Sequence, residues 1–152
     1  MVHIIHRIGI KSTAAKVYKA ISTIDGLAHW WTEEVEGDEN IGGKIQFTFR
    51  SERGDIKGSM AMQVQELKPD SYVRWRCVDG PAEWIGTEVS FELSEQDDQI
   101  IIIFGHRNWK KEVDFKAHCS MKWAVFLLSL REYVEKGKGK PSPHDLKIDN
   151  WN

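Results

Sequence analysis

Hydrophobic and polar residues alternate along the middle of the chain, which is the pattern of half-buried β-strands. In the segment 44–50, Ile45, Phe47 and Phe49 alternate with polar residues. A similar alternation, or a short β-rich run, occurs in the segments 3–10, 56–64, 73–77, 85–93 and 100–107. The connections between residues 44 and 107 are too short for crossover helices. The sequence therefore predicts an antiparallel sheet of about six strands.

Helical spacing of apolar residues occurs near both ends of the sequence. Ser12 or Thr13 can cap a first helix, whose apolar stripe is formed by Ala14, Val17, Ala20 and Ile21. A second short helix is predicted over 25–31, with Asp25 as its cap. A long final helix is predicted to end at Gly137, a residue suited to a helix C-terminus. Its buried side is predicted to hold Cys119, Trp123, Phe126, Leu127, Leu130, Tyr133 and Val134.

One domain is expected, because no internal repeat and no change of composition divides the 152 residues. The predicted strands and helices lie within residues 1–137. The segment 138–152 is rich in lysine and contains glycine and proline, so we expect an irregular, solvated tail. The fold class is α+β, with two short helices after the first strand and a long C-terminal helix.

The charge balance argues against a nucleic-acid-binding surface. Charged residues make up 29% of the chain, but the net charge is only -2, and such a surface needs a clustered excess of lysine and arginine. Unbroken apolar stretches such as 124–128 are too short to cross a membrane, and no apolar signal-peptide region opens the chain. We therefore expect a cytoplasmic protein without membrane insertion, in which Cys77 and Cys119 are buried thiols.

Seven short motifs follow one another in a recognisable order. They are HWWT at 29–32, IGGKIQF at 41–47, DIKGSM at 55–60, QELKPD at 65–70, WRC at 75–77, FGHRNW at 104–109 and WAVFLLSLREYVEKGKG at 123–139. With this order the chain resembles the START-like (SRPBCC) superfamily, which includes birch-pollen-allergen-like proteins. More narrowly, it resembles the bacterial homologues of the activator of the heat-shock chaperone ATPase. The resemblance implies a helix-grip domain over residues 1–137, in which a bent sheet holds the last helix around an apolar cavity.

The aromatic content indicates a candidate ligand site. Seven tryptophans and six phenylalanines exceed what a small core ordinarily needs, and most members of the resembled superfamily bind lipids or other small apolar molecules in the cavity. Inward positions and the ends of elements supply the candidate ligand-binding residues: Trp30, Phe47, Phe49, Met60, Met62, Trp75, Trp84, Phe104, His106, Trp109, Trp123 and Leu127. The alternative is that these side chains fill a packed core.

His106 is the polar residue among these candidates. It shares the inward side of its strand with Phe104, so it is either a hydrogen-bonded core residue or a contact that orients a ligand. Some superfamily members are cyclases or hydrolases, but such an enzyme needs a polar pair in the cavity. Asp79, Glu83 and Asp114 have no partner at a diagnostic spacing. Binding of a small hydrophobic molecule is therefore preferred to catalysis, and no catalytic residue is assigned.

No metal site or cofactor is predicted. His3 and His6 face opposite sides of a strand, and the residue four positions after His118 is Lys122. Contact with a chaperone is a third hypothesis for the function, and a homodimer is left open. The resembled eukaryotic activator carries a separate N-terminal domain for which this chain has no room. We therefore expect that the chain alone does not stimulate a chaperone ATPase.

Overall fold

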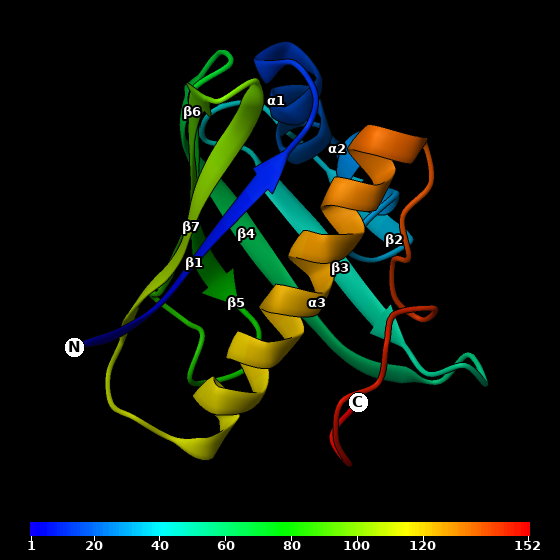
Figure 1. The fold of residues 1–152 in the computed structure, drawn as a ribbon. Coiled ribbons are helices and arrows are strands. Elements are labelled where there is room, and N and C mark those ends of the chain that lie inside the picture. Colours follow the sequence, from blue (N-terminus) through cyan, green and yellow to red (C-terminus); the bar gives the residue numbers. More distant parts are fainter.

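A sheet of seven antiparallel strands curves around a long helix in the computed structural model, which describes all 152 residues (Figure 1). The strands are β1 (Val2–Ile10), β2 (Glu34–Gly37), β3 (Lys44–Arg50), β4 (Ile56–Lys68), β5 (Tyr72–Asp79), β6 (Glu88–Gln96) and β7 (Gln99–Trp109). Their order in the sheet is β1-β7-β6-β5-β4-β3-β2. Two short helices, α1 (Ala14–Ser22) and α2 (Ile24–Ala28), follow β1, and α3 (Asp114–Lys136) follows β7. The predicted α+β helix-grip fold is confirmed.

The sequence predicts about six strands, and the structure has seven. The additional strand, β2, is a four-residue edge strand that pairs with β3. Its residues are mostly exposed, so they show no alternation of hydrophobic and polar positions. The strand predicted over 85–93 begins later, at Glu88, and Ile85 lies in the preceding turn with 47% of its surface exposed.

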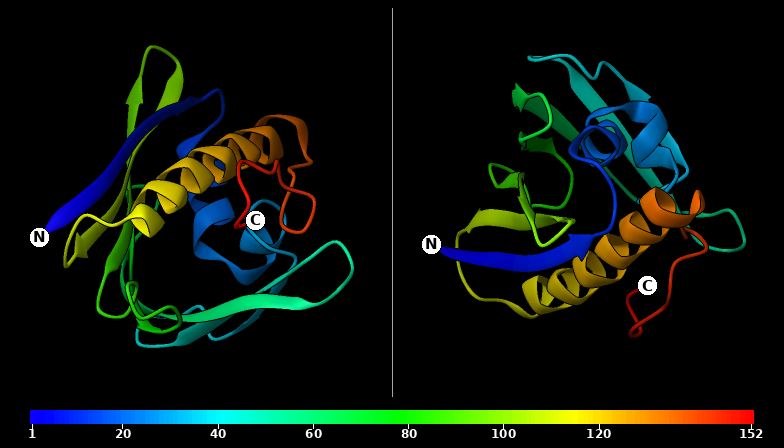
Figure 2. Two further views of the ribbon diagram at one scale, coloured as in Figure 1. Left: turned by 90° about the horizontal axis from the view of Figure 1, so that it is seen from below. Right: turned by 45° about the horizontal axis from the view of Figure 1, so that its top comes forward.

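The sheet is bent, and α1, α2 and α3 lie on its concave side in both views of Figure 2. Register shifts interrupt the pairing of β1 with β7, of β3 with β4 and of β4 with β5. Irregularities of this kind bend a strand and increase its local twist. The curvature therefore follows from the backbone pairing and leaves a space that large side chains have to fill.

The helix ends agree with two predicted caps and correct a third. Thr13 caps α1 with its hydroxyl, and Gly137 ends α3 in the left-handed conformation with φ of 83°. None of the helices is long and apolar enough to span a membrane. The helix predicted over 25–31 is shorter and is capped by Thr23 instead of Asp25. The Thr23 hydroxyl accepts a backbone N–H of the first turn at 3.0 Å, which lets the helix begin one residue earlier.

The tail, residues 138–152, forms no helix or strand, and its inner side is buried, in contrast to the solvated end expected from its composition. The tail turns back beside α3 (Figure 1), and Ser142 and Asp145 are buried. The backbone N–H of Ser142 donates to the carbonyl of Trp31 at 2.8 Å, and its carbonyl accepts from the N–H of Glu33 at 3.1 Å. These hydrogen bonds join segments far apart in the sequence, which the composition of the tail does not reveal.

Gly139→Ala is expected to loosen the tail and to lower the free energy of unfolding by about 1–3 kcal/mol. A Cβ atom at this position would lie 2.6 Å from the carbonyl oxygen of His29 and 2.8 Å from that of Ser129. Both atoms belong to the backbone, so neither can move aside alone. Gly58→Ala is the matched control, because nothing lies within 4 Å of its added Cβ. Thermal unfolding of both variants checks the expectation, and equal melting temperatures would contradict it.

Candidate functional site

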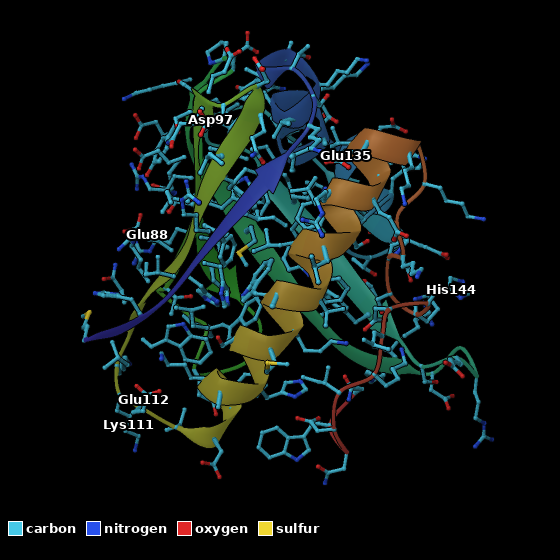
Figure 3. All side chains as sticks on the ribbon, in the orientation of Figure 1. Glu88, Asp97, Lys111, Glu112, Glu135 and His144 are labelled. Carbon is cyan, nitrogen blue, oxygen red and sulfur yellow. The ribbon has the colours of Figure 1, made fainter.

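Aromatic side chains fill the space between the sheet and α3 (Figure 3). Trp31 lies at the centre of this group, with its ring centroid 4.4 Å from that of Phe47 and 4.8 Å from that of Trp123. The ring of Trp75 is almost parallel to that of Trp31, at 6.1 Å. All four side chains are at most 2% exposed. This part of the interior is therefore a packed aromatic core.

His106 lies inside the core and uses both ring nitrogens. Trp123 Nε1–H donates to Nδ1 at 3.0 Å, so Nε2 carries the proton and donates to the hydroxyl of Thr87 at 2.8 Å. The Thr87 hydroxyl in turn donates to the carbonyl of Trp84 at 2.5 Å. Burial lowers the pKa of His106 to about 3, so the ring is neutral at physiological pH. The geometry favours the hydrogen-bonded core residue among the two interpretations of His106.

The apolar pocket of this molecule lies between the first half of α3, the strands β3 and β4, and the tail. Its volume is about 200 Å³. The aromatic residues that line it are Trp31, Phe49, Trp84, Phe115, Trp123, Phe126 and Trp151. A larger hollow of about 570 Å³ beside β1 and the end of α3 is lined mainly by charged and polar residues. The smaller pocket is therefore the one that suits an apolar molecule.

Charged side chains from α3 and the tail lie beside this pocket. Asp145 forms ion pairs with Lys122 and with Lys147, the latter at 3.1 Å. Burial opposes ionisation of Asp145, but the hydrogen bonds and charges of the two lysines outweigh it and hold the pKa of the carboxyl below its usual value. His118 Nδ1 lies 2.7 Å from a carboxylate oxygen of Asp149. The Lys122–Asp145 and His118–Asp149 pairs attach the tail to α3 at the pocket.

Four of the twelve candidate ligand-binding residues line the pocket: Phe49, Met60, Trp84 and Trp123. The other eight lie in the interior away from it: Trp30, Phe47, Met62, Trp75, Phe104, His106, Trp109 and Leu127. Trp30 attaches the segment after α2 to α1, because its Nε1–H donates to the carbonyl of Ala20 at 2.9 Å. The structure thus separates the aromatic candidates into a pocket group and a larger packed group.

Several pocket residues are absent from the sequence-based candidates. Phe115, Cys119, Lys122 and Phe126 recur at helical spacing on one side of α3, so this signal was available in the sequence. The pocket residues of the tail are Ser142, Asp145, Trp151 and Asn152. They follow no periodic pattern, and only the folded path of the tail brings them to the pocket.

Comparison with known proteins agrees with this architecture. The model of the family described as "Activator of Hsp90 ATPase homolog 1-like protein" (AHSA1) matches residues 11–135. No curated protein matches the chain. The chain is 42% identical to the Aha1 dimer from Colwellia psychrerythraea, a solution structure, with a TM-score of 0.78 over 91% of this chain and 100% of that one.

More distant solved structures share the fold. SSP2350 from Staphylococcus saprophyticus is 13% identical, with a TM-score of 0.72 over 93% of this chain and 98% of that one. The AHSA1-like protein from Aeromonas hydrophila is 14% identical, with a TM-score of 0.71 over 90% of this chain and 94% of that one. The family model matches 125 residues (11–135), and the order of motifs and the helix-grip architecture agree with it. The chain belongs to the AHSA1 family, the activator of Hsp90 ATPase homolog 1-like proteins of the START-like superfamily.

Proposed function

We propose that the chain binds a small apolar molecule in the pocket between α3, the β3–β4 strands and the tail. The observation that carries this proposal is the concentration of seven aromatic residues around one hollow of about 200 Å³. Aromatic walls bind flat apolar molecules through burial and ring stacking. The helix-grip fold and the family support a ligand-binding module. The proposed site lies at one end of the aromatic core, since the core itself is packed.

Met60 and Met62 give a matched test of this location. They lie two residues apart on β4, but Met60 lines the pocket, whereas Met62 is fully buried in the core and does not line it. We expect Met60→Trp to narrow the pocket, keep the melting temperature, and weaken binding of the uncharged fluorescent probe N-phenyl-1-naphthylamine by about tenfold. Met62→Trp overpacks the core and is expected to lower the free energy of unfolding by about 1–3 kcal/mol.

The two variants are compared by thermal unfolding and by energy transfer from tryptophan to the probe. Native mass spectrometry of the freshly purified protein gives an independent readout, because a co-purified ligand would be seen as added mass. If the native protein does not bind the probe, or if Met60→Trp binds it as tightly as the native protein, the proposed site is wrong.

A hydrolase is the second candidate function, and the His118–Asp149 pair favours it. An imidazole oriented by a carboxylate can act as a general base, and His118 lines the pocket. The neighbouring Cys119 is not a candidate nucleophile, because burial raises the pKa of its thiol to about 12. Hydrolysis of 1-naphthyl acetate tests this candidate. A rate above background that is lost in His118→Asn would favour the enzyme, and equal rates would favour simple binding.

Two kinds of protein contact are tested separately. The relative from Colwellia psychrerythraea is described as a dimer, and light scattering of this chain at several concentrations would detect a homodimer.

Contact with a chaperone is tested by mixing the chain with the Hsp90-type chaperone of the same organism. A several-fold rise in ATP turnover would favour an activating role over ligand binding alone.

A further inference from the structure

The charged groups at the pocket are not balanced. Lys57 lines the pocket on β4, and Lys122 lines it on α3. Lys147 approaches from the tail, where it binds the same carboxylate as Lys122. One carboxylate, that of Asp145, therefore faces three ammonium groups. Asp149 is a second carboxylate nearby, which is hydrogen-bonded to His118 and also attracts Lys122, but the three ammonium groups still outnumber the two carboxylates.

Lys57 is the ammonium group that is left without a partner. Lys57 is exposed, and its side chain makes no ion pair and no hydrogen bond, while Lys122 and Lys147 both bind Asp145. Burial and then repulsion from Lys147 and Lys122 lower the pKa of Lys57, and the attraction of Asp145 only partly opposes them. An added negative charge at this point would be attracted by Lys57 and would reduce the repulsion among the three lysines.

A hydrogen-bond donor in the pocket wall also lacks a strong acceptor. The indole N–H of Trp84 is buried in the pocket wall, and the thiol sulfur of Cys119, a weak acceptor, is the group that it meets. Buried donors of this kind normally have a partner. Asn152 contributes one unpaired acceptor, Oδ1, in the tail wall. The pocket thus offers a cation without a partner, Lys57, and a donor with only a weak acceptor, Trp84, and both are complementary to an anionic acceptor.

We propose that the ligand of this pocket is a small apolar acid, whose anionic group pairs with Lys57 while its apolar body lies against the aromatic wall. The inference rests on the proposed function and narrows it to one chemical class. The carboxylate of Asp145 already pairs with the other two lysines, so the pocket itself shows that its charged side accommodates a carboxylate. An amine of the same shape would meet an uncompensated positive charge and is disfavoured.

The test compares 2-naphthoate with 2-naphthamide, which have the same ring system and differ in charge, by isothermal titration calorimetry. The native protein is expected to bind 2-naphthoate about fivefold more tightly, as suits a partly exposed ion pair. Lys57→Gln brings the affinity for 2-naphthoate down to that for 2-naphthamide. Raising the salt to 0.5 M should also reduce the preference of the native protein, because salt screens partly exposed charges.

Lys138→Gln is the matched control, because Lys138 is exposed, makes no ion pair and does not line the pocket. It removes the same charge and should keep the preference for 2-naphthoate. Equal binding of the two probes to the native protein would overturn the acidic class and leave the apolar pocket intact. A preference that survives Lys57→Gln would also overturn it. If neither probe binds, the proposed function fails, and this inference fails with it.

Discussion

Trp31→Ala is expected to lower the free energy of unfolding by about 3–5 kcal/mol, the largest effect of any single truncation considered for this protein. The side chain is 1% exposed, and its ring contacts those of Phe47, Trp75 and Trp123. Alanine would leave a cavity that these neighbours cannot close, because each ring is held by other parts of the sheet or by α3. Most of the cost is therefore lost burial and lost packing.

Trp151→Ala is the matched control for this prediction. Trp151 also lines the pocket, but half of its surface is exposed, so its truncation should change stability by less than about 0.5 kcal/mol. Urea unfolding of the two variants and the native protein gives the three free energies. A cost below about 1 kcal/mol for Trp31→Ala would mean that the interior between the sheet and α3 is loosely packed. Such a result would support the apolar cavity between the sheet and the last helix that the family resemblance implies.

The arrangement of strands was predictable because buried strands carry a regular alternation. Phe47 and Phe49 mark the inward side of β3, and the short turns after it allow only antiparallel pairing. The edge strand β2 was not predictable, since an edge strand with polar residues on both faces has no periodic signal. Likewise, the cap of α2 could not be decided between neighbouring polar residues, because both Thr23 and Asp25 are good N-cap residue types.

The site was predictable only in part, for a different reason. The alternation along a strand predicts which side chains point into the core. It does not predict which of those side chains are packed and which line a pocket. Met60 and Met62 illustrate this limit, because both are apolar positions two residues apart on one strand, yet only Met60 lines the pocket. The position of Asp145 depends on where an irregular segment returns to the domain, which no local pattern encodes.

His106→Gln is expected to cost about 1–3 kcal/mol of stability at pH 7.5 and to leave binding of the uncharged probe unchanged. The reason is that the ring joins Trp123 to Thr87 inside the core and does not line the pocket. Glutamine has one acceptor and one donor group, but it cannot hold them in the same positions as the imidazole nitrogens. Weaker probe binding without a loss of stability would instead support the role of His106 as a ligand contact.

The stability difference between the native protein and His106→Gln is expected to shrink as the pH falls. Burial lowers the pKa of His106 from its ordinary value of 6.5 to about 3 in the folded protein. Between these values the unfolded chain binds a proton at this residue that the folded protein does not bind. The free energy of unfolding of the native protein therefore falls with falling pH, by up to about 1.4 kcal/mol per pH unit from this group. Glutamine does not titrate, so the variant lacks this contribution. Urea unfolding at pH 7.5, 5.5 and 4.5 measures both curves, and parallel curves would show that His106 is protonated as readily in the folded protein as in the unfolded chain.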